Sequence, residues 1–222
     1  MRLIKTTLVA VMATLMIAGC SQSQAAPPDP ATLLAKATAN ARAASSVHVT
    51  GSGGCTGTAF KVDMQLRKDG VGAGQVTLGN TVLSLVTTPT KLFVNAPQDF
   101  WTAQANADAA KAIGTKWVDM PQAGNPCLVA LGTMKNVLDN YLGQTGTPTL
   151  VSGSTYNGQP ARLVAVGTTV GIWLSNAETS YPLAVKSPDT STDISFADWG
   201  AAVEVVIPPA HDVISTATLP KK

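Results

Sequence analysis

The chain has 222 residues, of which 45% are hydrophobic and only 13% are charged. Its formal net charge of +2 at pH 7 disappears if residues 1–19 are removed, because Arg2 and Lys5 lie there and 13 basic residues then face 13 acidic ones. A near-neutral chain with scattered charges has no basic patch for nucleic acid and none to reinforce membrane contact. The remaining 203 residues suffice for one domain with a substantial core.

The N-terminal residues have the layout of an export signal. Two basic residues precede a mostly apolar run over 6–18, which is shorter than the roughly 20 residues that span a bilayer. The run ends at Ala18-Gly19-Cys20, which matches the bacterial lipobox, so Cys20 is expected to become the first mature residue and to carry a diacylglycerol thioether. An ordinary secretory signal with a chance cysteine is the alternative. We expect a signal peptide over 1–19, lipidated Cys20 and a flexible tether over 20–28, and a single domain over 29–222, anchored at the extracytoplasmic face of the cell membrane.

The first predicted elements are a helix and an antiparallel set of strands. Asp29 can cap a helix that starts at Pro30 and ends near Ser45, since proline suits a first helical turn. From Val47 onward the apolar period changes to two, most clearly over 60–67, where every even position is apolar. Short turns between the later strands favour an antiparallel meander over crossover helices.

Two predicted helices, over 98–113 and 125–142, interrupt the meander, with a short strand over 116–120 between them. The second is the most amphipathic helix of the chain, starting after Asn125 and ending at Gly143. The sheet is expected to resume with strands over 150–155, 161–166, 170–174, 183–186, 193–196 and 203–206, before a closing C-terminal arm. So large an antiparallel sheet curls under its own twist, and helices can cover its concave face, which predicts an α+β half-barrel.

The two cysteines left after Cys20, Cys55 and Cys127, are expected to form a disulfide. They would lie in an oxidising compartment, and the chain has no Cys-x-x-Cys motif to indicate a redox pair. Two buried free thiols are the alternative. A bridge across a separation of 72 residues would stabilise the fold by about 4 kcal/mol and would tie the helix over 125–142 to the loop after the first strand.

The residues that carry enzyme chemistry do not form a recognisable set. His48 and His211 have no second histidine or cysteine at metal-ligand spacing. A nucleophile-elbow motif is missing, and the glycines over 70–74 follow a hairpin turn and open no helix. We therefore expect no catalytic residue, no metal and no cofactor, and a protein that is not an enzyme.

A set of short motifs resembles a known family when taken in order. The motifs are the lipobox, Leu92-Phe93-Val94 before Phe100-Trp101, Lys116-Trp117-Val118, Tyr181-Pro182-Leu183, Ile194 to Gly200, and Ile207-Pro208-Pro209. In this order they resemble the actinobacterial LppX/LprG-type (LppX_LprAFG) lipoproteins over essentially the whole mature chain. The resemblance implies a fold similar to the periplasmic lipoprotein carriers and the carriage of an acylated lipid, glycolipid or lipoglycan between the inner membrane and the outer envelope. A membrane transporter would then be a partner.

An apolar space between the sheet and the helices is the expected lipid site, in a protein expected to be a monomer. Its predicted walls are sheet residues and facing helix residues: Phe60, Val62, Met64, Leu66, Leu131, Met134, Leu138 and Tyr141. The alternative is that these side chains fill a close-packed core. The protein would then be a structural or protein-binding envelope lipoprotein without a lipid ligand.

Overall fold

The computed structural model of the protein describes residues 28–220 and begins with helix α1, Pro30–Ala43. The Asp29 carboxylate accepts a hydrogen bond from the Thr32 amide at 2.8 Å, so the helix starts at the predicted cap. Strands β1 to β5 follow as a meander: Ser46–Cys55, Thr58–Arg67, Gly72–Leu78, Thr81–Thr87 and Leu92–Asn95. In β2 every even-numbered residue from Phe60 to Leu66 is buried, as the alternation predicts.

Four helices and one strand follow β5 along the chain. They are α2 Gln98–Gln104, α3 Ala107–Ile113, β6 Trp117–Met120, α4 Pro126–Gly132 and α5 Met134–Leu142. The chain continues with β7 Pro148–Val151, β8 Thr155–Tyr156, β9 Gln159–Val166, β10 Val170–Ser175, β11 Pro182–Ser187, β12 Thr192–Ala197 and β13 Val213–Ser215.

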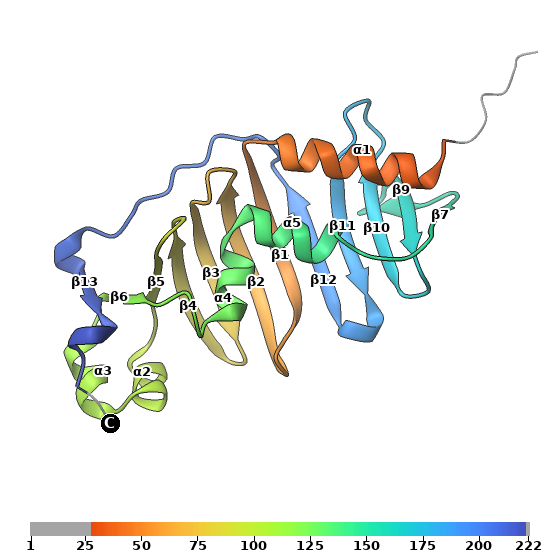
Figure 1. The fold of residues 1–222 in the computed structure, drawn as a ribbon. Coiled ribbons are helices and arrows are strands. Elements are labelled where there is room, and N and C mark those ends of the chain that lie inside the picture. Colours follow the sequence, from red (N-terminus) through yellow and green to blue (C-terminus); the bar gives the residue numbers. More distant parts are fainter. Residues whose placement is uncertain (1–27, 221–222) are drawn as a thin grey trace, which may run out of the picture.

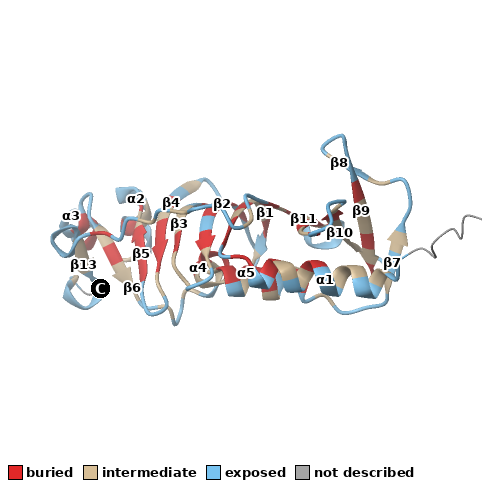
Figure 2. Ribbon diagram, turned by 90° about the horizontal axis from the view of Figure 1, so that it is seen from above, coloured by how far each residue is buried: buried red, intermediate tan, exposed pale blue. Residues whose placement is uncertain are grey.

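One curved, unclosed sheet contains these strands in a single domain (Figure 1). The strand order is β13-β6-β5-β4-β3-β2-β1-β12-β11-β10-β9-β7, with β8 paired to β9. The described pairings are antiparallel apart from β13 with β6, which is parallel. Seen from above, the sheet bends around α4, α5 and α1, which lie along its concave face (Figure 2). The predicted α+β half-barrel is confirmed.

Both predicted long helices are broken in the structure, which corrects the expected boundaries. The helix over 98–113 divides because the Asn106 side chain accepts a hydrogen bond from the Ala109 amide at 2.8 Å and caps a new helix, α3. The helix over 125–142 divides at Thr133, whose backbone is extended, with φ −129° and ψ 141°.

The strand predicted over 203–206 is wrong. These residues lie in the extended segment between β12 and β13 and pair with no strand. Val203 and Val205 are half-buried while Glu204 and Val206 are exposed. Period-two burial therefore marks an extended chain with one packed face, whether or not a neighbouring strand provides hydrogen bonds.

Candidate functional site

The predicted disulfide between Cys55 and Cys127 is present, with the two Cα atoms 5.9 Å apart. Cys55 ends β1 and Cys127 lies in the first turn of α4, so the bond ties the start of this helix to the β1–β2 hairpin. The start of α4 is thus held covalently on the sheet.

The other end of α4 contacts the sheet without any intervening layer. The Thr87 hydroxyl of β4 donates a hydrogen bond to the Gly132 carbonyl. A Cβ atom added at Gly132 would lie 2.5 Å from Thr87 Cγ2, and one added at Gly72 would lie 2.6 Å from the Gly132 oxygen. Backbones this close leave no room for a ligand between α4 and strands β3 and β4.

Thr133 separates this fixed helix from α5. Its hydroxyl accepts a hydrogen bond from the Asn136 amide at 3.3 Å and so caps α5. The Asn136 side chain in turn donates to the Val129 carbonyl of α4 at 3.0 Å. Side chains thus form the hydrogen bonds that these backbone groups lose where the helix is broken, and α5 starts as a separate helix.

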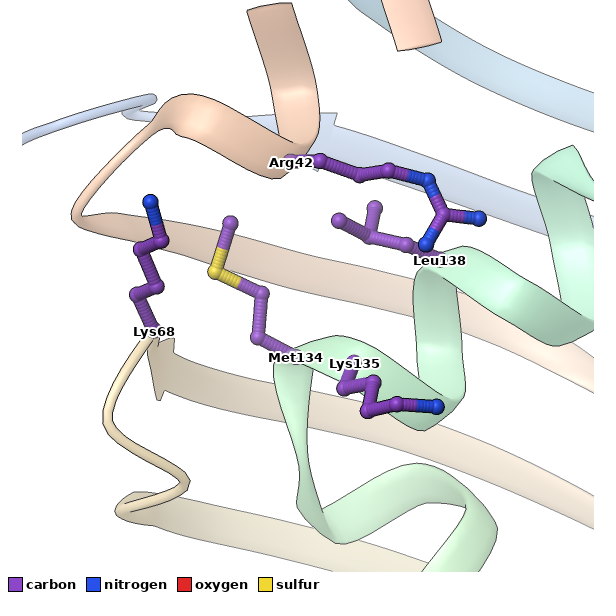
Figure 3. A pocket seen from close by; sticks show the side chains of 5 residues that line it. All are labelled: Arg42, Lys68, Met134, Lys135 and Leu138. Carbon is purple, nitrogen blue, oxygen red and sulfur yellow. The ribbon is translucent and has the colours of Figure 1, made fainter. Parts of the chain in front are cut away.

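A pocket of about 230 Å³ opens at the N-terminal end of α5 (Figure 3). We call it the basic pocket; its lining residues are Arg42, Lys68, Met134, Lys135 and Leu138. Met134 and Leu138 are buried and supply its apolar floor, while the three basic side chains come from the end of α1, the β2–β3 turn and the first turn of α5.

One carboxylate, that of Asp139, pairs with two of these cations. It lies 2.7 Å from the Arg42 guanidinium and 2.7 Å from the Lys135 ammonium. Hydrogen bonds from Lys135, which has the larger effect, and from Arg42 lower the pKa of Asp139 below its ordinary value. Lys68 instead approaches the Ala43 carbonyl at the end of α1, with Nζ and oxygen 3.5 Å apart. The pocket thus contains more positive than negative charge.

A second, more polar hollow of about 460 Å³ lies at the other end of α5. We call it the polar cleft; its lining residues are Gly54, Asn140, Tyr141, Gln144, Thr169, Val170, Val185, Ser187, Asp189, Thr190 and Thr192. Burial raises the pKa of the Tyr141 phenol above its ordinary value of 10.0, which is already well above neutral pH, so the hydroxyl is protonated and can donate a hydrogen bond. Hydroxyl, amide and carboxylate groups from β11, β12, the 3-10 turn Pro188–Thr190, α5 and two loop residues meet here.

The eight predicted wall residues lie together around α4, α5 and the sheet. Phe60, Val62, Met64, Leu66 and Leu131 are buried in the shared core. Met134 and Leu138 are buried as well and form the floor of the basic pocket, whereas the partly buried Tyr141 lines the polar cleft. Their role in lipid binding stays a prediction.

Sequence reasoning missed the cationic rim of the basic pocket. Arg42, Lys68 and Lys135 are far apart along the chain and carry no local motif, so only the fold brings them together. The lipobox and Cys20 lie outside the described residues. Within residues 28–220, no helix has the length and apolar character needed to cross a membrane, and no three His, Cys, Asp or Glu residues gather to hold a metal ion.

Comparison with known proteins gives structural matches only. No family model matches the chain, and no curated protein matches it in sequence. The crystal structure of LprF from Mycobacterium bovis superposes with a TM-score of 0.54 at 15% identity, covering 82% of this chain and 99% of that one. An uncharacterized conserved protein from Thermus thermophilus matches with a TM-score of 0.39 at 8% identity, over 83% and 98% of the two chains. The chain therefore shares the fold of LprF.

Proposed function

We propose that this protein is a cell-envelope lipoprotein that binds an acylated lipid or glycolipid on the concave face of its sheet and carries it between the inner membrane and the outer envelope. Lipidated Cys20 would anchor it at the extracytoplasmic face of the cell membrane, where a transporter could exchange ligand with it. The protein works as a carrier and not as an enzyme. The LprF-like fold and the lipobox support this proposal.

The observation that carries the proposal is the position of α5, which lies along the concave face of the sheet (Figure 2) with a hollow at each of its ends. Its buried side, which includes Val137, Leu138 and Leu142, lies in the shared core, while α4 beside it is fixed by the disulfide and the Gly132 contact. Movement of α5 about Thr133 would expose this apolar side without moving α4. An acyl chain that replaces it gains about 0.8 kcal/mol for each buried methylene.

The volume of the basic pocket limits the size of the ligand that it can hold in this conformation. At about 230 Å³ it is smaller than the roughly 300–1,000 Å³ of ordinary ligand pockets. It accommodates a headgroup or the end of one chain, and a long acyl chain must continue between α5 and the sheet. The apolar walls Phe60, Val62, Met64 and Leu66 lie on the face that such a chain would meet.

A structural or protein-binding lipoprotein is the second candidate. The close packing of the predicted wall residues favours it, because a filled core of this kind needs no ligand. The two candidates differ in what purified protein contains and in how it tolerates a larger side chain on the concave face.

The test uses the full-length chain with Cys20→Ala, purified and extracted with organic solvent for mass spectrometry. The carrier is expected to yield bound lipid. Val62→Trp is expected to remain folded but to lose the lipid, because the indole occupies its place. Lys61→Trp is the matched control: it adds the same ring to the exposed face of β2, and it should keep the lipid.

The same experiment can also contradict the carrier proposal. Absence of lipid from the Cys20→Ala protein, together with unfolding of Val62→Trp, would sink the carrier proposal. Overpacking of a filled core costs roughly 1–3 kcal/mol or more, so the destabilisation is measurable in denaturant.

A further inference from the structure

The basic pocket combines a small apolar floor with a cationic rim, and this combination indicates a particular ligand. Met134 and Leu138 can contact the first methylenes of a chain, while Arg42, Lys68 and Lys135 surround the opening (Figure 3). An anionic headgroup would supply these cations with an additional counter-charge, whereas a neutral headgroup would not.

The charges that face the pocket do not cancel. Three cations meet one carboxylate, Asp139, and the negative end of the α1 dipole, which is equivalent to about half an elementary charge. Asp69 follows Lys68 in the turn but is paired with Arg67. Lys135 also lies in the first turn of α5, where the helix dipole disfavours a cation and favours an anion.

From these charges we infer that the basic pocket binds the phosphate of an anionic, phosphate-bearing lipid, whose acyl chain starts at Met134 and Leu138. Lys68 and Lys135 bind the phosphate oxygens. Arg42 retains its ion pair with Asp139 and thereby holds α1 against α5 beside the ligand. This inference rests on the proposed function and specifies the ligand class within it.

Two single-chain lipids with the same acyl group separate headgroup from chain. Lysophosphatidic acid has a phosphate monoester, and lysophosphatidylcholine has a phosphate masked by a choline cation. Titration calorimetry with the full-length Cys20→Ala protein, below micelle-forming concentrations, is expected to give roughly tenfold tighter binding of lysophosphatidic acid. The preference should shrink as salt rises, because exposed charges are screened beyond about 10 Å at 0.1 M.

Substitution of the rim tests the named residues. Lys68→Gln and Lys135→Gln should each weaken lysophosphatidic acid binding by roughly fivefold and leave lysophosphatidylcholine binding unchanged. Lys135 has a side chain that is 80% exposed and Lys68 lies in an exposed turn, so neither change threatens the fold. Lys61→Gln and Lys111→Gln remove the same charge from exposed positions on β2 and α3 and should change neither affinity.

Each result decides the proposal. Equal affinities of the two lipids, or equal effects of all four substitutions, would overturn the phosphate site while leaving the carrier function in place. No binding of either lipid would remove both proposals together. Inorganic phosphate serves as the third probe: if it binds as tightly as lysophosphatidic acid, the pocket is a site for free phosphate and the lipid assignment fails.

Discussion

The contact between Gly132 and Thr87 offers a direct test of how α4 lies on the sheet. Gly132 ends α4, and a methyl group at this position would lie 2.5 Å from Thr87 Cγ2 but 3.5 Å or more from the other Thr87 atoms. Gly132→Ala therefore meets one obstacle, a single methyl group. Overpacking of this kind costs roughly 1–3 kcal/mol, against which alanine gains up to about 1 kcal/mol in helix propensity.

The obstacle can be removed without loss of the hydrogen bond. Thr87→Ser deletes Cγ2 but keeps the hydroxyl that donates to the Gly132 carbonyl. Alone it should destabilise the protein by about 1 kcal/mol, since it deletes one buried methyl group. In the double variant the alanine methyl occupies the vacated space, so we expect stability close to that of Thr87→Ser and a favourable coupling of about 1–3 kcal/mol.

Urea unfolding followed by far-ultraviolet circular dichroism measures the cycle of four proteins. The slope of the unfolding free energy against urea should stay constant across them. If the coupling is below about 0.5 kcal/mol, α4 does not lie this close to the sheet, and a ligand layer can fit between them.

Three further predictions concern the disulfide, the lipid anchor and Asp139. Replacement of Cys55 and Cys127 together by serine should destabilise the protein by about 4 kcal/mol, because the bond spans 72 residues, and should lower Tm by roughly 8–16 °C in a thermal scan; a change under about 2 °C would contradict the bridge. Cys20→Ala should release the domain from membranes or leave the chain unprocessed, and an unmodified Cys20 in mass spectra of membrane-purified protein would rule out the lipid anchor. The lowered pKa of Asp139 means that its stabilising contribution is complete above its ordinary pKa of 3.8 and is lost as pH falls through the folded value. Asp139→Asn should therefore flatten part of the decline of Tm as the pH falls below the ordinary aspartate pKa of 3.8, and identical pH profiles would refute this assignment.

Local patterns in the sequence determined a large part of this fold. Residues 60–67 alternate apolar and polar side chains, and β2 buries the apolar ones because a pleated strand exposes its two faces in turn. The Asp29-Pro30 pair likewise predicts the start of α1, since the cap and the first helical turn involve adjacent residues. The pairing of Cys55 with Cys127 followed from counting, because only two cysteines remained after Cys20.

Long-range contacts decided the rest. The break at Thr133 depends on how α4 meets the sheet. The Thr87 hydroxyl donates to the Gly132 carbonyl and the Asn136 side chain donates to the Val129 carbonyl, two acceptors that an unbroken helix would have paired internally. The 203–206 segment alternates like a strand, but a strand also needs a hydrogen-bonding neighbour, and the path of the chain supplies none. One pocket rim is formed by Arg42, Lys68 and Lys135, because the end of α1, the β2–β3 turn and the start of α5 meet at one end of the strands. These side chains share no period or motif in the sequence, so only folding brings them together.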